Sequence, residues 1–498
     1  MKIRVRLSLF GAAVMAVPAM LSAQQRGPEN LLPTNQHPTQ ISQEPAPELA
    51  PALAQQPEQQ ASEQKIIEQP VEVGADVSAP AGPVNPQSVA EAFSAELAQG
   101  APSAVQSWSL ANASALVLVI ENIGADGLDP ADYGLLALND AIAAGPSLGL
   151  DETASRSFAW LVEDLRDGRT PMDARKQWFV LDPDADRYPT ANLMAQALAS
   201  GDLAATLATI MPIHPDFGRL KEALAQTPQE DVERRLMIRA NMDRWRWLAR
   251  DLGSQYLITN VPEFQLRLTV NDTIVRTYRT VVGKPGRTAT PQLAESVEGV
   301  IFNPTWTVPQ SIVKGEGLGA RVLGNPNWAK RAGYKAIKGE NGWVGVVQQP
   351  GPRNSLGLMK LDMPNRHAIF LHDTPSRRLF ANDNRALSHG CIRTERATEL
   401  AITLAILQGG RTAKESVDLI KGGEYTKVGF QKSMPVYITY FTMAQDIEGK
   451  LSSFADIYDR DGPVLASFAQ PRRANRSRVT GEQIIPIEDD LRISAQIS

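Results

Sequence analysis

The sequence predicts an α+β protein in which a helical domain comes first and a β-rich domain follows. Two observations carry this prediction: apolar residues recur at helical spacing between residues 88 and 250, and they alternate with polar residues after Gly253. A chain of 498 residues is long enough for two or three domains. The charged fraction of 21% is ordinary, and the net charge of −5 gives no reason to expect a nucleic-acid partner.

The first residues are typical of a cleavable signal peptide. Lys2, Arg4 and Arg6 precede an apolar run from Leu7 to Met20, which ends in small residues. This run is shorter than the roughly 20 residues that a bilayer core requires. We therefore expect residues 1–23 to direct export to the periplasm. An uncleaved segment that tethers the protein to the inner membrane is the alternative.

Two further segments have the composition of disordered chain. Residues 24–87 are rich in Pro, Gln, Glu and Ala and cannot bury enough apolar surface to offset chain entropy. We interpret them as a tether that spans roughly 45 Å. Residues 471–498 begin with basic residues, among them Arg472 and Arg473, and end with acidic ones. We expect them to form a disordered charged tail.

A helical scaffold domain is predicted over residues 88–250. The spacing is clearest in one set of apolar residues at i, i+3, i+4 and i+7: Phe158, Leu161, Val162 and Leu165. Gly168 is expected to end that helix. Three other stretches show a similar pattern: Val89 to Leu97, Leu193 to Leu207, and Val232 to Leu248.

Two acidic clusters in this domain lack the ligand spacing of a metal site. One, at Asp182, Asp184 and Asp186, opens like a calcium loop, but Arg187 stands where the turn needs Gly and Leu193 where a Glu ligand is needed. The other cluster comprises Asp126, Asp129 and Asp132. We interpret it as a set of helix caps.

Strand spacing begins after Gly253. Alternation from Phe264 to Val270 and from Ile274 to Val282 predicts a hairpin with one buried face, turning at Asn271 and Asp272. Three more strands are expected: Val297 to Phe302, Trp343 to Val347, and Ala368 to Leu371. These elements predict a β-rich domain over residues 251–470.

The reactive side chains concentrate between His367 and Arg393, a segment that holds three of the five histidines and the single cysteine. A lone cysteine is commonly a buried small hydrophobe, so its neighbours decide its role. An unperturbed thiol is only a few per cent ionised near neutral pH and needs activation. We expect Cys391 to lie just before a helix from Glu395 to Leu407, whose dipole favours an anion.

The neighbours of Cys391 add to this activation. Arg393 supplies a positive charge, and His372 or His389 can take the thiol proton. The backbone amides of Gly390 and Cys391 are expected to stabilise an oxyanion. A zinc site is not expected, because His367 and His372 are five residues apart on a strand and no second cysteine is present. We predict no metal and no cofactor.

The run Ser388-His389-Gly390-Cys391-Ile392-Arg393, with His372 nineteen residues before the cysteine, resembles the signature of the YkuD-type L,D-transpeptidases. Five more runs resemble its large YcbB-like branch: 245–248, 261–264, 303–309, 351–357 and 372–376. The resemblance covers about residues 88–469. It implies a helical scaffold followed by a β-sandwich catalytic domain with a capping subdomain at about 309–350.

The resemblance also implies roles for the site residues. Cys391 would be the nucleophile and His372 the general base. His389 and Arg393 would orient the substrate and stabilise developing charge, and Ser388 would be a supporting donor. Weaker candidates for lining the groove are Asn354, Trp306 and Tyr334, whereas Trp245 and Trp247 are expected in the core between domains. Only a short stretch, His214 to Arg234, stands where the branch often inserts a peptidoglycan-binding module.

The implied activity is transfer between peptidoglycan stem peptides. A donor tetrapeptide would acylate the cysteine, an amine acceptor would form a 3-3 cross-link, and carbapenems would inhibit. Three alternatives remain open at this point: an L,D-carboxypeptidase or other hydrolase, a protein-to-peptidoglycan attachment enzyme, and a non-catalytic scaffold for other wall-synthesis proteins.

Overall fold

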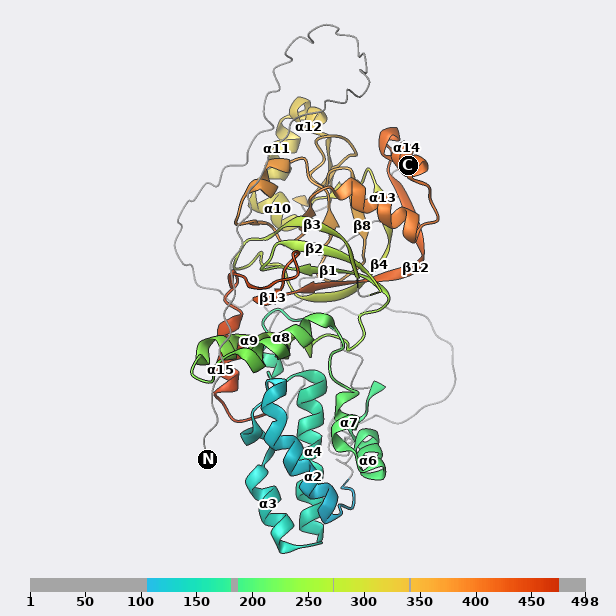
Figure 1. The fold of residues 1–498 in the computed structure, drawn as a ribbon. Coiled ribbons are helices and arrows are strands. Elements are labelled where there is room, and N and C mark those ends of the chain that lie inside the picture. The colour runs from blue at the N-terminus through green and yellow to red at the C-terminus, as the bar shows by residue number, and fades with distance from the viewer. Residues whose placement is uncertain (1–104, 181–186, 272, 340–341, 474–498) are drawn as a thin grey trace, which may run out of the picture. The chain divides into compact units, whose positions relative to one another are not determined.

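The computed structural model describes residues 105–180, 187–271, 273–339 and 342–473, all within one compact unit, Val84–Ser498 (Figure 1). Four predicted features lie outside the described residues: the signal peptide, the tether, the helix at Val89 to Leu97, and the acidic run at 182–186. Most of the predicted tail also lies outside them. Within the described ranges no helix is long and apolar enough to cross a membrane.

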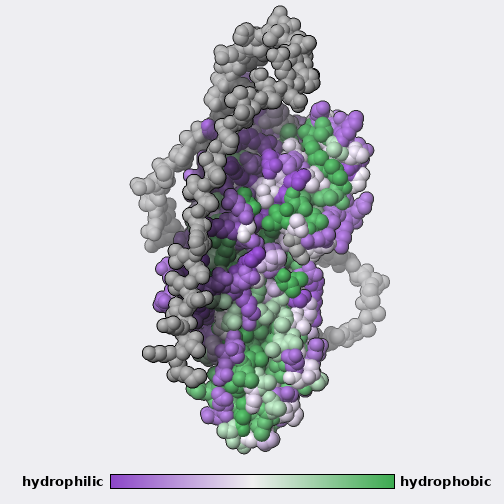
Figure 2. Space-filling view, viewed as in Figure 1, coloured by the Kyte–Doolittle hydropathy of each residue, from purple (hydrophilic) through white to green (hydrophobic). Residues whose placement is uncertain are grey.

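The predicted scaffold domain is built mainly of helices in its described part. Its α-helices are α2 (Leu110–Asn122), α3 (Leu135–Ala144), α4 (Leu148–Asp167), α6 (Thr190–Ser200), α7 (Leu203–Ala208), α8 (Pro215–Gln226) and α9 (Val232–Trp245). The predicted stripe on α4 is buried, because Phe158, Leu161, Val162 and Leu165 are at most 1% exposed. That helix ends at Gly168, as predicted. Figure 2 shows apolar side chains gathered on the outer surface of this domain.

Two local predictions in the scaffold have different outcomes. The helical pattern predicted from Leu193 to Leu207 is confirmed but divided between α6 and α7, because Gly201 adopts a left-handed φ of 68° and Asp202 caps the second helix. The interpretation of the acidic cluster as helix caps is largely wrong. Of the three aspartates interpreted as caps, only Asp129 caps a helix, the 3-10 turn η2 (Pro130–Tyr133). Asp126 instead pairs with Lys221, and Asp132 pairs with Arg169.

The β-rich domain is built on one nine-stranded sheet. Its strands are β1 (Gln255–Asn260), β2 (Gln265–Val270), β3 (Thr273–Gly283), β4 (Leu293–Phe302), β8 (Met359–Asp362), β9 (Leu371–His372), β10 (Ala386–Ser388), β11 (Ile392–Thr394) and β12 (Thr426–Thr439). Their order is β10-β3-β11-β9-β8-β4-β12-β1-β2, and β2 also pairs with β3. The α+β fold is therefore confirmed, but the sheet closes on itself instead of forming the two separate sheets of a sandwich.

Both faces of this sheet are covered. On one face it packs against the apolar helix α13 (Ala397–Leu407), which is followed by α14 (Ala413–Gly422). On the other face aromatic side chains such as Tyr256 and Tyr437 share a core with α8 and α9. These two helices lie directly below the sheet in Figure 1. The β2–β3 hairpin therefore does not have the single buried face that was predicted. Arg267 on its second face is buried too, because Glu263 and the carbonyl of Gln445 accept its hydrogen bonds.

The predicted cap is a small subdomain with its own sheet and core. It contains β5 (Trp306–Thr307), β6 (Tyr334–Lys338), β7 (Val344–Gln348), α10 (Gln310–Gly315), α11 (Leu318–Gly324) and α12 (Pro326–Ala332). Its core comprises Val308, Val313, Val322, Ala329 and Val346. The strand predicted at Ala368 to Leu371 is not formed as such. Ala368 has a left-handed φ of 45°, so pairing begins only at Leu371.

The chain returns to the scaffold at its end. A short hairpin, β13 (Met443–Gln445) and β14 (Leu451–Ser453), precedes α15 (Asp461–Phe468), which packs on α9. The tail predicted to be disordered from residue 471 is ordered at its start. The side chain of Arg472 is only 5% exposed and pairs with Glu163 at 2.6 Å and with Asp164 at 2.9 Å, because the buried carboxylate of Asp164 favours a cation beside it.

Candidate active site

Three charged or titratable side chains form a row across neighbouring strands. Lys360 on β8 is the register partner of His372 on β9, and His372 is the register partner of Arg393 on β11. Register partners on neighbouring strands point to the same face of a sheet. Lys360, His372 and Arg393 therefore share one face, and we call them the active-site row. Cys391 immediately precedes β11, two residues before Arg393.

Cys391 is a half-buried thiol at the end of this row. Its Sγ donates to the backbone carbonyl of Ala368 at 3.5 Å. Burial raises the pKa of the thiol above its ordinary value of 9.0, while a backbone hydrogen bond from Phe370, the Lys360 ammonium and the Arg393 guanidinium each lower this pKa. Because burial dominates, the resting cysteine is protonated at neutral pH.

The predicted helix-dipole activation of Cys391 is wrong. Strand β11 follows the cysteine directly, and α13 begins only at Ala397 instead of Glu395. The favourable field of a helix terminus fades within its first turn, so it does not reach a side chain six residues upstream. The positive charges near the thiol come from side chains on the sheet.

His372 is buried and prepared to accept a proton. Its Nδ1 lies 2.5 Å from the backbone carbonyl of Asp373, which can only accept a hydrogen bond, so Nδ1 carries the proton and Nε2 is unprotonated. Burial lowers the pKa of His372 to about 3, with further lowering by Arg393 and Lys360 against the opposing hydrogen bond to Asp373. The imidazole is therefore neutral at neutral pH.

Asp373 holds this histidine in place. Its carboxylate accepts hydrogen bonds from the backbone N–H of Leu358 at 2.9 Å and from Arg377. The chain at Gly357 lies so close that an added Cβ would be 2.3 Å from an oxygen of this carboxylate. Gly357 also has a φ of 63°, which favours glycine. Asp373 is thus fixed on both sides, and its carbonyl sets the tautomer of His372.

The thiol and His372 do not hydrogen-bond to each other in the part of the chain that the structure describes. The thiol must rotate away from the carbonyl of Ala368 before it can give its proton to Nε2 of His372. Such reorientation is usual in unliganded active sites.

The loop before Cys391 is tied down by its own polar groups. Ser388 Oγ donates to the carbonyl of Cys391 at 2.6 Å and accepts from the N–H of Gly390 at 3.1 Å. Thr290 Oγ1 donates to the carbonyl of Gly390 at 2.7 Å. In this state the hydroxyl proton of Ser388 and the N–H of Gly390 are both engaged inside the loop. The predicted amide at Gly390 is free for an oxyanion only if Ser388 releases it.

Arg393 is the side chain best placed to receive negative charge. It is half-buried, burial lowers the pKa of its guanidinium, and the nearby Cys391 raises this pKa. Within the described residues the guanidinium has neither a hydrogen-bond acceptor nor a counter-ion. It is therefore available to a carbonyl oxygen of a substrate that becomes anionic.

His389 faces the cap. Its side chain is 53% exposed, and Nε2 lies 3.3 Å from Oε1 of Glu316, between α10 and α11. The predicted site residues thus fall into two groups. Cys391, His372 and Arg393 are brought together on the sheet, whereas His389 joins the catalytic loop to the cap.

The weaker candidates have structural roles. Asn354 is 1% exposed and donates to the carbonyls of Pro304 and Gln349, which fixes the turn at the base of the cap. Tyr334 stacks on Trp328 inside the cap. Two tryptophans lie in the core between domains, as predicted: Trp245 and Trp247. Trp306 lies half-buried on β5 against the core of the cap.

Lys360, Thr290 and Glu316 belong to the site but were missed by the sequence analysis. Each comes from an element far from Cys391 along the chain. Alternation in Met359-Lys360-Leu361-Asp362 was a detectable strand signal, but only the register of three strands connects Lys360 to the site. His367, the third histidine of the segment, packs against Phe179 in a tilted arrangement, with ring centroids 4.2 Å apart. No group of three or more His, Cys, Asp or Glu residues suited to a metal occurs among the residues described.

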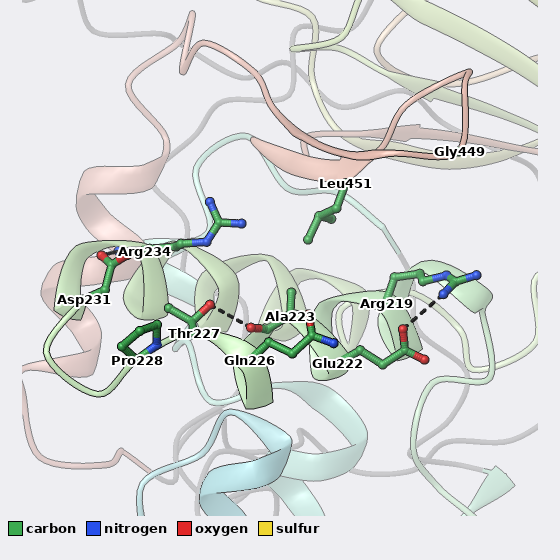
Figure 3. A pocket seen from close by; sticks show the side chains of 10 residues that line it. All are labelled: Arg219, Glu222, Ala223, Gln226, Thr227, Pro228, Asp231, Arg234, Gly449 and Leu451. Carbon is green, nitrogen blue, oxygen red and sulfur yellow. Dashed lines mark hydrogen bonds and ion pairs between the residues drawn. The ribbon is translucent and has the colours of Figure 1, made fainter. Parts of the chain in front are cut away.

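A polar groove lies elsewhere, between α8, α9 and the β13–β14 hairpin (Figure 3). Its volume is about 620 Å³, and its walls include Arg219, Glu222, Arg234 and Leu451. Arg219 pairs with Glu222 across one side of it. Most of its wall comes from the short stretch His214 to Arg234, and the β13–β14 hairpin completes it.

Comparison with known proteins assigns both domains. Residues 254–438 match the YkuD family, described as an L,D-transpeptidase catalytic domain, and residues 106–224 match a Scaffold domain. A curated Haemophilus influenzae protein assigned to the L,D-transpeptidases is 28% identical over 223 residues. That match covers 42% of this chain and 45% of the relative, so the chain spans less than half of that protein.

Solved structures add only weak likeness. L,D-transpeptidase 1 of Mycobacterium tuberculosis is 12% identical, with 37% of this chain and 61% of that chain covered and a TM-score of 0.17. An L,D-transpeptidase in complex with imipenem is 11% identical, with 37% and 59% covered and a TM-score of 0.17.

Proposed function

Because residues 254–438 form an L,D-transpeptidase catalytic domain behind a Scaffold domain at residues 106–224, we propose that this chain is a cysteine acyltransferase of peptidoglycan. Cys391 is its nucleophile and His372 its general base. The observation that carries the proposal is the active-site row beside the thiol. In this row His372 is neutral with Nε2 unprotonated, and the guanidinium of Arg393 next to it can stabilise negative charge on a substrate.

In the acylation step His372 Nε2 takes the thiol proton as sulfur attacks the carbonyl at the L-centre of diaminopimelate in a donor tetrapeptide stem. A carbon–sulfur bond forms, and the carbonyl oxygen becomes an anion beside Arg393. Collapse of this intermediate breaks the amide bond to D-alanine. His372 returns its proton to the departing amine, so the products are a thioester and free D-alanine.

The second step consumes the thioester. An amine of a neighbouring stem, with His372 again removing a proton, attacks the thioester carbonyl, forms a 3-3 cross-link and restores the thiol. Water in place of the amine gives an L,D-carboxypeptidase, and a protein amine gives attachment of a protein to the wall. The contact between Glu316 and His389 favours transfer, because it holds the cap against the catalytic loop and a covered thioester meets less water.

Carbapenems are expected to acylate Cys391 by the same opening step, since a strained β-lactam carbonyl replaces the peptide carbonyl. The reaction belongs in the periplasm, where the substrate lies, and residues 1–23 supply the export signal by composition. Retention in the inner membrane through the same segment is the alternative.

Mass spectrometry of muropeptides incubated with the purified protein tests the proposal. We expect cross-linked tetrapeptide–tripeptide dimers and free D-alanine, and neither product with Cys391→Ser. If the wild-type chain released only uncross-linked tripeptide, the hydrolase would replace the transpeptidase. If no product formed and no carbapenem adduct appeared on Cys391, a non-catalytic scaffold would be the better assignment.

Glu316→Ala tests the cap within the same assay. Loss of the contact with His389 should raise the tripeptide-to-dimer ratio several-fold while the acylation rate changes little. Lys335→Ala, on the exposed side of β6, is the control. An unchanged product ratio would show that this contact does not exclude water.

A further inference from the structure

Lys360 has no part in the sequence prediction or in the mechanism above, yet it lies in the active-site row. Its register partner is His372. Its Nζ sits 3.4 Å from the ring centroid of Phe370, and the backbone of Phe370 hydrogen-bonds the sulfur of Cys391. A cation over an aromatic face is held by the ring quadrupole, so the ammonium is fixed near the thiol.

We propose that Lys360 is a positioning residue that, together with Arg393, stabilises the thiolate of Cys391 and so sets the fraction of reactive nucleophile. The inference rests on the proposed role of Cys391 as the nucleophile. The positive charges that activate the sulfur are then the side chains of Lys360 on β8 and Arg393 on β11, and not an imidazolium ion.

The charges around the thiol support this assignment. The charged side chains that act on the thiol are Lys360 on β8 and Arg393 on β11, and the neutral His372 on β9 shares their face of the sheet. Glu316 of the cap contacts His389 at 3.3 Å. The thiol is therefore the group in this cluster that gains by becoming an anion.

Both cations act on both reacting groups. Lys360 and Arg393 lower the pKa of Cys391, and the influence of Lys360 is the larger of the two. They also lower the pKa of His372, which makes its imidazolium form a stronger acid. One charge pattern therefore eases loss of the thiol proton and also eases return of that proton to the leaving amine.

The pH dependence of alkylation by iodoacetamide tests the proposal on the full chain. Cys391 is the single cysteine, so mass spectrometry of the intact protein reports its alkylation alone. Lys360→Met should raise the midpoint of the curve of alkylation rate against pH by about one pH unit, because an opposite charge nearby shifts a pKa by that order. Alkylation below the midpoint should then fall about tenfold, since only the thiolate reacts.

Two matched variants separate charge from packing. Lys360→Arg keeps the charge and should stay near the wild-type midpoint. Lys432→Met removes an exposed lysine from β12 of the same sheet and should change nothing. Circular dichroism checks each fold, and Lys360→Gln replaces the Met variant if that variant does not fold.

The proposal is overturned if Lys360→Met and Lys432→Met have the same alkylation midpoint. It is also overturned if Lys360→Arg shifts the midpoint as far as Lys360→Met, because packing would then be the cause. The assay needs no peptidoglycan. Failure to form 3-3 cross-links would therefore count against the proposed function alone, and an unmoved midpoint would count against Lys360 alone.

Discussion

Replacing His372 by alanine tests the general base through the pH dependence of acylation. In the wild-type chain the pKa of His372 is about 3 and that of Cys391 lies above 9.0. Between these values the pair is a thiol beside a neutral imidazole, which is the reactive state for a general base. The acylation rate should therefore be flat from about pH 4.5 to about pH 8.

Without the imidazole only pre-formed thiolate reacts. With the pKa of Cys391 at 9 or above, at most about 1% of the thiol is ionised at pH 7. His372→Ala should therefore acylate about 100-fold more slowly at pH 7, and it should regain about tenfold per pH unit as the pH rises. The defect is thus large near neutrality and nearly absent at strongly alkaline pH.

Single-turnover acylation by a carbapenem, followed by loss of β-lactam absorbance at constant ionic strength, measures both profiles. The depressed pKa of His372 means that the unfolded chain binds a proton between about pH 6.5 and 3 that the folded chain does not. Its contribution to stability is therefore present above 6.5 and lost as the pH falls toward 3. Tryptophan fluorescence must confirm the fold at each acidic point.

Two results would refute this reasoning. An acid limb near pH 6.5 in the wild-type chain would mean that His372 titrates as an ordinary histidine. A flat profile close to wild type in His372→Ala would remove it as the base and move that role to His389. His389→Ala is the matched control, because it should keep the flat profile.

Three further substitutions have definite expected outcomes. Cys391→Ser should abolish carbapenem acylation, measured by intact-protein mass spectrometry, because an alkoxide is much harder to form than a thiolate at neutral pH; residual adduct would refute the nucleophile assignment. In Gly357→Ala the new Cβ would overlap the Asp373 carboxylate, so acylation should slow at least tenfold in a folded protein. A normal acylation rate would show that Asp373 is not needed to orient His372. Arg472→Met should lower the free energy of unfolding in urea by about 3 kcal/mol, because it removes the cation that pairs with the buried Asp164 carboxylate. Arg473→Met, in an exposed ion pair, should cost less than about 1 kcal/mol, and equal losses would contradict a buried ion pair at Arg472.

The parts of the site that lie in one short segment were predictable from the sequence. Cys391, Arg393 and the loop from Ser388 are contiguous, and His372 precedes them by nineteen residues within the same segment. Periodicity likewise predicted the buried stripe of α4 and the β2–β3 hairpin. These signals are local, so a single sequence contains them in full.

Long-range pairing explains what the sequence did not reveal. Lys360 reaches the site only because β8 pairs with β9, and Glu316 reaches it only because the cap lies against the catalytic loop. The alternating pattern predicts a solvent-facing Arg267, yet this side chain is buried because the carbonyl of Gln445, from a distant part of the chain, accepts its hydrogen bond. Each of these depends on register or on packing between segments distant in sequence.

The absence of a helix terminus at Cys391 has a chemical consequence. A cysteine at a helix terminus is commonly a thiolate at rest, whereas Cys391 is a protonated, half-buried thiol that donates to the carbonyl of Ala368. Thiolates are the form that oxidants attack, and the proposed periplasmic location is oxidising. Because His372 is neutral and Lys360 and Arg393 lie beside the thiol, the sulfur can stay protonated, and so resist oxidation, until a substrate displaces it toward His372. We therefore expect resting wild-type protein to resist peroxide better than variants in which the contact with Ala368 is lost.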